Sequence, residues 1–195
     1  MHDIKTTKGL IIGSRPVGEA DKIVSLLTED FGLISASAKA VRLERSKLRY
    51  GLQDYCLGTF SLVRGREFWR LVGVERGGRL RPIENSRIAT LVGRLCSLLK
   101  RLLQGEEANK PLFVSFKSIF DFLENNPDIS DQRLTSLESL AVLRILERLG
   151  YVGELDYLDG AERTDELTVQ VLDGVSSKRK KINGAINAAL KESHL

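Results

Sequence analysis

Residues 27–55 read LTEDFGLISASAKAVRLERSKLRYGLQDY and contain the pattern that decides the N-terminal fold. A tight turn at Asp30, Phe31 and Gly32 precedes residues 32–39, where Leu33, Ser35 and Ser37 alternate with Ile34, Ala36 and Ala38, as in a half-buried strand. Cations dominate the next residues, and a second apolar stretch begins at Leu52. A basic loop between two strands predicts a backbone suited to binding a polyanion.

Four further short segments favour strands: residues 6–15, 20–28, 52–63 and 68–75. Gly58 suggests a bulge, Arg64-Gly65-Arg66 a hairpin turn with two cations at its tip, and Gly77-Gly78 the end of the domain. Five short strands in about 80 residues fit an OB-fold, the five-stranded barrel that often binds oligonucleotides. The sequence therefore predicts an α+β protein, with an N-terminal OB-fold β-barrel at residues 1–81 and an α-helical bundle domain at residues 82–195.

Helical periodicity begins near residue 84 and continues to a stop at Gly105. Pro111 fits the first turn of a second helix, which should end at residues 125–127. Residues 135–149 are apolar around much of the circumference and predict a central, buried helix. Residues 167–172 suggest a short strand, and Ser176-Ser177 a cap for a last helix with residues 178–181 in its first turns.

Composition excludes several classes of protein. Hydrophobic content of 42% and charged content of 29% are ordinary for a soluble globular chain, and the apolar runs are too short for a membrane span. The first residues lack the layout of a signal peptide, so we expect a cytoplasmic protein. Cys56 and Cys96 are expected to be core residues rather than zinc ligands, and His2 and His194 lie at the chain ends.

Positive charge is concentrated in the N-terminal part. Residues 1–81 hold 15 Lys and Arg against 9 Asp and Glu, whereas residues 82–195 hold 15 against 17. This asymmetry assigns polyanion binding to the predicted barrel. The side chains expected to bind nucleic acid are those of the loop and of the strand ends, together with one aromatic residue: Arg15, Lys39, Arg42, Arg45, Lys47, Arg49, Arg64, Arg66 and Trp69.

Trp69 is included because unpaired bases stack on exposed aromatic rings. Phe68 and Trp69 are adjacent in a strand, so their side chains should point to opposite faces. We expect Trp69 to be the more exposed of the two, although packing of both rings against the protein is an equally good interpretation.

No catalytic motif is present in the sequence. Phosphate-binding glycine loops, GxSxG and HExxH are all missing, and the pair Glu106-Glu107 lies in a polar setting typical of a solvated surface. The sequence therefore predicts a protein that is not an enzyme and needs no cofactor. The basic run at residues 178–181 is a second possible anion-binding patch, with a solvated helix face as the simpler interpretation.

Four segments resemble the RecO family of bacterial recombination-mediator and DNA-annealing proteins. They are LIIGSRPVGEADKIVSLLT (10–28), LTEDFGLISASAKAVR (27–42), SKLRYGLQDY (46–55) and LERLGYVGEL (146–155). The resemblance implies an OB-fold, a helical C-terminal domain, binding of single- and double-stranded DNA, strand annealing, and assistance in loading a RecA recombinase. It implies RecR and the acidic C-terminal tail of single-strand-binding protein as partners, and DNA contacts at Lys39, Arg42, Lys47 and Arg49.

The sequence also departs from the family. Many members carry a four-cysteine zinc motif after the segment that matches Leu149-Gly150-Tyr151, whereas this chain reads ELDYLDGAERTDE there. No zinc is expected, and packing must hold the local loop instead. Two alternatives stay open from the sequence alone: an OB-fold RNA-binding protein outside repair, and a protein-interaction adaptor that works through its helical domain.

Overall fold

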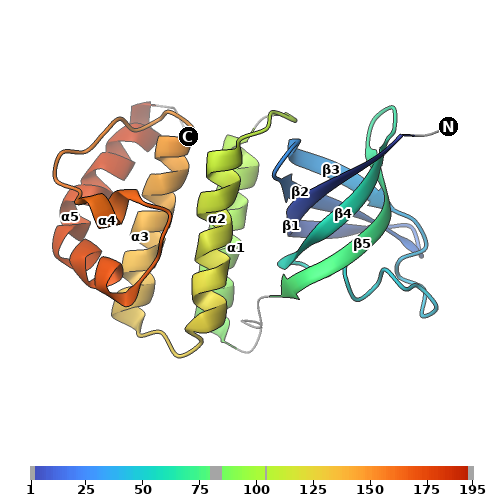
Figure 1. Ribbon diagram of the computed structural model, residues 1–195, viewed down its shortest axis with the longest axis horizontal. Coiled ribbons are helices and arrows are strands. Elements are labelled where there is room, and N and C mark those ends of the chain that lie inside the picture. Colours follow the sequence, from blue (N-terminus) through green and yellow to red (C-terminus); the bar gives the residue numbers. More distant parts are fainter. Residues whose placement is uncertain (1–2, 80–84, 104, 193–195) are drawn as a thin grey trace. The chain divides into compact units, whose positions relative to one another are not determined.

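The computed structural model describes residues 3–79, 85–103 and 105–192, and the side chains of residues 76–79 are outside that description (Figure 1). The chain packs into two compact units. The first comprises Met1–Leu80 and Lys100–Phe113, and the second comprises Arg81–Leu99 and Val114–Leu195. The sequence did not predict that residues 100–113 belong with the N-terminal unit.

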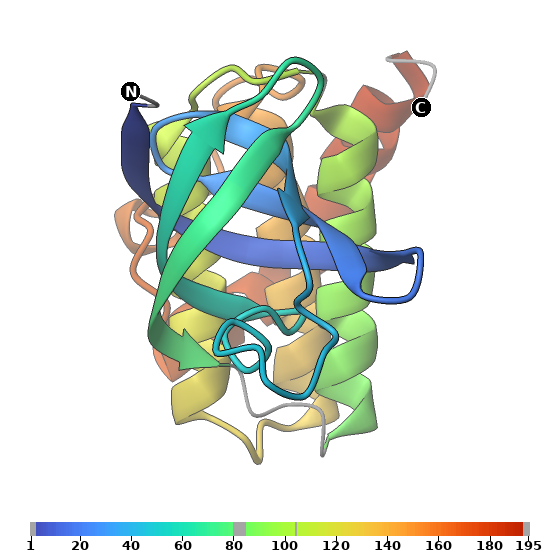
Figure 2. The same ribbon diagram turned by 90° about the vertical axis from the view of Figure 1, so that its right-hand side faces the viewer.

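Five strands form a closed barrel in the order β1-β2-β3-β5-β4, and Figure 2 shows them curving around the barrel axis. Neighbours are antiparallel except for β3 and β5, which close the barrel as a parallel pair through Ala36–Trp69 and Ser37–Arg70. The predicted fold class, a five-stranded barrel followed by helices, is confirmed. The strand bounds are β1 Ile4–Val17, β2 Asp21–Thr28, β3 Gly32–Ala38, β4 Cys56–Arg64 and β5 Trp69–Arg79.

The barrel interior follows from strand alternation. Along β3, Ile34, Ala36 and Ala38 are buried, whereas Ser35 is exposed and Ser37 is half-buried, as the sequence predicted. Large side chains from the other strands complete this core: Ile11, Val24, Leu26, Phe60, Leu62, Trp69 and Leu71. Small residues on β3 leave room for these bulky partners inside a narrow barrel.

Two predicted boundaries in this unit are wrong. Residues 52–55 belong to the turn before β4, because Tyr55 adopts a left-handed φ of 66° that a regular strand does not allow. Gly77 and Gly78 do not end the domain but lie within β5, where Gly78 pairs with Leu57. The bulge predicted at Gly58 is confirmed, since the register between β4 and β5 shifts between Leu57 and Gly58.

The segment 100–113 approaches the barrel closely at Gly32. This residue has a φ of 65°, and a side chain there would collide with the backbone of Glu107. Glycine is therefore required both by the left-handed turn and by the close approach. Nearby, the ammonium of Lys110 lies 3.8 Å from carboxylates of Glu29 and Asp30.

The second unit is helical. Its elements, two of which extend into the first unit, are α1 Ser86–Leu102, α2 Lys110–Asn125, α3 Asp131–Arg148, α4 Gly160–Arg163 and α5 Val169–Glu192. The stop before Gly105, Pro111 in a first turn and the end at Asn125 are confirmed. The central helix begins earlier than predicted, because Ser130 caps it by accepting a hydrogen bond from the Arg133 amide.

Two predictions for the C-terminal region are wrong. Residues 167–172 form no strand, since α5 begins at Val169 and buries Val171, Leu172 and Val175 with helical spacing. Ser176 and Ser177 do not cap the helix but lie inside it. The Ser177 hydroxyl donates to the Gly174 carbonyl at 2.7 Å, a local hydrogen bond that lets serine remain in a helix interior.

Both cysteines are buried, as expected for core residues. In the described part of the chain, every helix is too short or too polar to cross a membrane.

Candidate nucleic-acid interface

The loop between β3 and β4 begins with a fixed turn. Asp21 accepts hydrogen bonds from the Lys39 ammonium at 2.6 Å and from the Ala40 amide at 2.8 Å. These two donors, Lys39 first, lower the pKa of the Asp21 carboxyl. The Arg42 guanidinium donates to the Gly18 carbonyl at 2.9 Å. The start of the basic loop is thereby attached to the turn between β1 and β2.

The remainder of the loop is held by apolar side chains and presents its cations to solvent. Val41 and Leu52 are buried in the barrel core, and Leu48 packs against it. Between them, the exposed side chains of Arg45, Lys47 and Arg49 make no hydrogen bond or ion pair to any residue in the described ranges. Three free cations on an anchored loop are an arrangement that suits phosphate binding.

The outward face of the sheet continues this surface. Pairing places Arg15 opposite Ile23, Ile23 opposite Ser37, and Ser37 beside Arg70. Residues opposite one another share a face, so this row runs from β1 to β5 with an exposed arginine at each end. Lys39 follows Ser37 by two residues, about 7 Å along the chain direction. The row therefore connects the basic loop to the start of β5.

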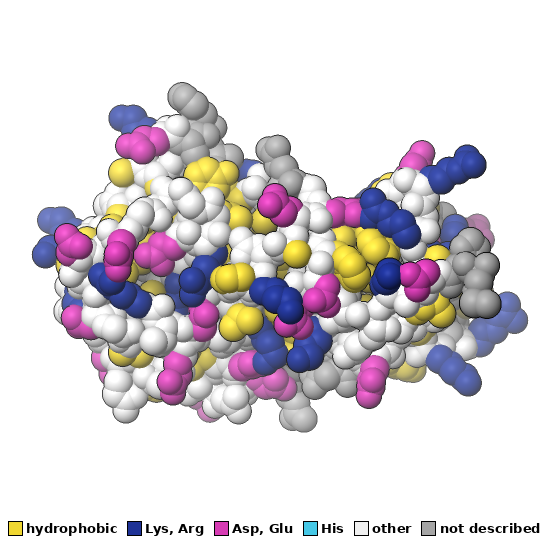
Figure 3. Space-filling model, turned by 45° about the horizontal axis from the view of Figure 1, so that its top comes forward, with side chains coloured by type: hydrophobic (Ala, Val, Ile, Leu, Met, Phe, Trp, Pro, Cys, Tyr) yellow, Lys and Arg dark blue, Asp and Glu magenta, His cyan; other side chains and the backbone are white. Residues whose placement is uncertain are grey.

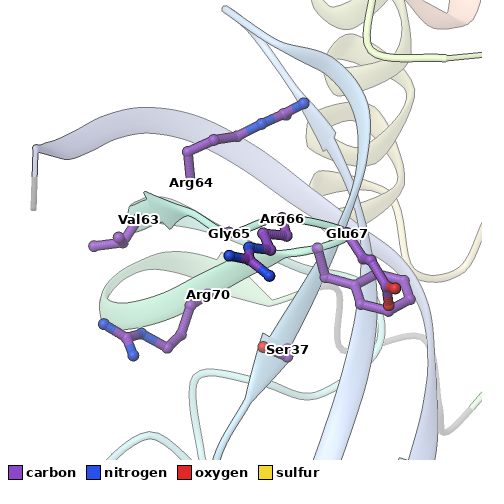
Figure 4. A pocket seen from close by; sticks show the side chains of 8 residues that line it. Ser37, Val63, Arg64, Gly65, Arg66, Glu67 and Arg70 are labelled. Carbon is purple, nitrogen blue, oxygen red and sulfur yellow. The ribbon is translucent and has the colours of Figure 1, made fainter.

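The turn between β4 and β5 borders a pocket of about 410 Å³ on the same part of the barrel (Figure 4). Its lining includes Ser37, Arg64, Arg66, Phe68 and Arg70. Figure 4 shows the guanidinium of Arg64 pointing away from those of Arg66 and Arg70. Both Arg66 and Arg70 are exposed, and neither forms an ion pair with a described residue.

The expectation that Trp69 is the exposed aromatic is wrong. Trp69 is only 6% exposed, whereas Phe68 is 40% exposed. The Trp69 ring packs against Phe31 with centroids 5.0 Å apart, and the Arg64 guanidinium lies 4.9 Å from its centroid. Its indole nitrogen donates to Glu106 at 3.2 Å. Because its ring is covered by these neighbours, Trp69 cannot serve as a stacking platform in this conformation.

The roles of Arg64 and of the pair Glu106-Glu107 differ from those that the sequence predicted. The Arg64 guanidinium pairs with the Glu106 carboxylate, so an internal anion already occupies it. Glu106 and Glu107 are exposed, as predicted, but Glu106 also organises Arg64 and Trp69. The sequence reasoning missed Phe68 and Arg70, although strand alternation had reduced the choice of aromatic to two residues.

The second basic patch divides into two kinds of residue. Lys178 donates to Asp159 at 2.6 Å and to Glu162 at 2.9 Å, so it has a structural role. Lys181 lies 5.7 Å from the Tyr157 ring centroid. Residues 178–181 lie in the middle of α5 and not in its first turn, where the sequence placed them. Cations in a first turn are disfavoured by the helix dipole, and at the observed position this unfavourable interaction is absent.

The loop after α3 is held by polar groups in addition to packing. The buried Arg144 guanidinium donates to the carbonyls of Thr164 and Glu162, and burial lowers its pKa. Arg148 pairs with Asp165 at 3.3 Å. Among the described residues, no three His, Cys, Asp or Glu side chains are grouped as a metal site would require.

Figure 3 shows that cations and carboxylates are interspersed over the face in view. The net charge alone therefore does not identify an interface, and the assignment depends on the particular residues described above. The residues that carry the assignment are those whose charged groups form no ion pair with a described residue: Arg45, Lys47, Arg49, Arg66 and Arg70.

Comparison with known proteins gives a consistent result. Residues 1–76 match the family model described as Recombination protein O N terminal. The chain is 36% identical over 125 residues to a DNA repair protein RecO of Dehalococcoides mccartyi strain CBDB1, covering 64% of this chain and 49% of the relative. It is 28% identical over 186 residues to DNA repair protein RecO of Clostridium novyi strain NT, covering 91% and 70%. The chain thus spans about half the length of the first of these relatives.

Proposed function

Because the chain belongs to the RecO family, we propose that it is a DNA-binding protein of recombinational repair that binds and anneals single-stranded DNA and assists recombinase loading. The proposed mechanism is physical rather than catalytic. Cations on the barrel neutralise phosphates of two strands, reduce their mutual repulsion and let complementary bases meet.

One observation carries this proposal. Arg45, Lys47 and Arg49 project from a loop that is anchored on the barrel, and their charged groups are free of described protein partners. Free cations bind phosphate without first breaking an internal ion pair, and their fixed backbone lowers the entropy lost on binding. Lys39 and Arg42 lie at the start of the same loop and are proposed as supporting contacts, as are Arg15 and Arg66.

The test is fluorescence anisotropy of a labelled 30-mer single strand across a salt series. The variant Arg45→Gln/Lys47→Gln/Arg49→Gln should bind about tenfold or more weakly at low salt. If each cation contacts one phosphate, the slope of log affinity against log salt should become shallower by about 2. Arg42 is left unchanged because its guanidinium holds the Gly18 carbonyl.

A matched control removes the same charge from another part of the barrel unit. Lys8 and Lys110 both lie beside Glu29, and Lys5 pairs with Asp3. The variant Lys5→Gln/Lys8→Gln/Lys110→Gln should keep most of the affinity and the salt slope. Equal loss in the two triple variants would show that net charge, rather than the loop, controls binding, and the interface assignment would be withdrawn.

The proposal includes specific partners. We propose RecR and the acidic tail of single-strand-binding protein as protein partners, and binding of duplex as well as single-stranded DNA. Pull-down with purified RecR and anisotropy with a labelled tail peptide test the two protein partners separately. An annealing assay with complementary strands tests the proposed activity, which should be weaker in the loop triple variant than in its control.

A further inference from the structure

The pocket beside the turn between β4 and β5 has the composition of a site for one unpaired nucleotide. We propose that Phe68 stacks on a base of single-stranded DNA while Arg66 and Arg70 hold the adjoining phosphates. This inference rests on the proposed function and adds to it a residue that distinguishes single strands from duplex.

The first support is the exposure of Phe68. Exposed phenylalanine is unfavourable in water, and here the neighbouring Trp69 takes the inward position, so Phe68 stays 40% exposed at the pocket. Aromatic faces stack on any base without reading its identity, which suits a protein that binds single strands of varied sequence.

The second support is the set of free charges. Arg66 and Arg70 both line the pocket and have no ion-pair partner among the described residues. Glu67 also lines the pocket, and its carboxylate offsets part of the positive charge of the two arginines. Arg64 is paired with Glu106 and points away in Figure 4, so the charged groups left in the lining are two guanidinium groups and one carboxylate. The pocket therefore combines a net positive charge with an exposed aromatic ring, and a nucleotide has the matching phosphate and base.

The third support is size and rigidity. A volume of about 410 Å³ lies within the range of small-molecule sites, roughly 300–1,000 Å³. The walls come from β3, the end of β4 and the start of β5, where Ser37 pairs with Arg70. The Ser37 hydroxyl donates to the Trp69 carbonyl at 3.4 Å, which joins the two strands at the pocket. A base stacked on Phe68 must lie outside a duplex, because neighbouring base pairs cover both faces of a base inside one.

The experiment compares three ligands: a 30-mer of thymidine, the same backbone without bases, and a 30-bp duplex. Phe68→Leu keeps an apolar side chain but removes the aromatic face. It should weaken binding of the thymidine strand about five- to tenfold and leave the abasic strand and the duplex within twofold. Phe68→Trp should restore binding of the thymidine strand. Arg66→Gln/Arg70→Gln should weaken binding of all three ligands and make the salt slope shallower.

Photocrosslinking gives an independent readout on the wild-type protein. A single strand that carries 5-iodouracil should crosslink to Phe68, as located by mass spectrometry of the digested protein. Crosslinks confined to other residues would contradict the proposal, and so would equal effects of Phe68→Leu on the three ligands.

The outcomes separate the two proposals. If wild-type protein binds single strands with steep salt dependence and Phe68→Leu binds them equally well, the proposed function stands and the stacking site is rejected. If wild-type protein binds none of the three ligands at low salt, both are rejected.

Discussion

Trp69 and Phe68 show how one residue step changes the role of a side chain. The two rings are similar in chemistry, yet one is buried against Phe31 and the other faces the pocket. The indole has a donor that Glu106 accepts, so its burial leaves no polar group unsatisfied. The exposed position is left to Phe68, a purely apolar ring whose contact with water is unfavourable.

Arg64 and Arg70 provide a prediction at this scale. Arg64→Gln should change the affinity for a single strand less than twofold, because a phosphate must first displace Glu106 from that guanidinium. Arg70→Gln should lower the affinity about fivefold at low salt, since Arg70 has no competing described partner. Anisotropy with the same 30-mer measures both variants. A larger loss for Arg64→Gln than for Arg70→Gln would contradict this ranking.

Glu106→Gln tests the same idea in the opposite direction. Glutamine keeps an acceptor for the Trp69 indole but removes the charge that holds Arg64. The affinity for a single strand should rise about twofold, measured by anisotropy at low salt. The double variant Arg64→Gln/Glu106→Gln should lose that gain. An increase that persists in the double variant would mean that general charge, rather than the release of Arg64, is responsible.

At the scale of elements, the side chain of Lys178 on α5 contacts two carboxylates of α4 and its cap. Asp159 caps α4, Glu162 completes its capping box, and both carboxylates accept from Lys178 on α5. Glu162 is 4% exposed, and the Lys178 ammonium is the cation that contacts its buried carboxylate. The lysine links a short helix, which would not be stable alone, to a long one.

Lys178→Met should lower Tm by on the order of 5 °C in thermal unfolding followed by circular dichroism. Lys180→Met is the control, because Lys180 is exposed on the same helix and should leave Tm unchanged. Similar Tm values for the two variants would contradict the structural role of Lys178.

The same contact predicts a dependence on pH. The hydrogen bonds that Lys178 donates, first to Asp159 and then to Glu162, raise the pKa of Lys178 above its ordinary 10.5. A raised pKa in the folded state means that the stabilisation is complete below the ordinary value and is lost as pH rises through the folded value. The Tm difference between wild type and Lys178→Met should therefore be constant from about pH 6 to 10 and shrink above it. A difference that grows with alkaline pH would contradict the assignment.

At the scale of the whole molecule, the asymmetry of charge predicts that the proposed DNA binding takes place on the barrel unit. Neutralising Arg179, Lys180 and Lys181 together should change neither the affinity nor the salt slope for single strands, in contrast to the loop triple variant. The anisotropy titration of the first test measures this directly. A comparable loss in slope would show that α5 supplies a second DNA surface.

The sequence by itself determined the outline of this protein. Alternation along residues 32–39 and the four other short strand-like segments predicted the barrel, and helical periodicity after residue 84 predicted the helices. Both are local patterns, so neighbouring residues contain the information. The cations at residues 39–49 were equally visible, although their role in binding DNA stays a proposal.

Only the tertiary structure decided which of two faces is inside and which charges are free. Alternation separates Phe68 from Trp69, but the closing of the barrel between β3 and β5 selects the buried ring. The partner of Arg64 lies 42 positions later in the chain, and the extent of α5 follows from the buried positions of Val171, Leu172 and Val175. These outcomes depend on contacts between distant segments, and a local pattern cannot contain them because it reports only the neighbours of each residue along the chain.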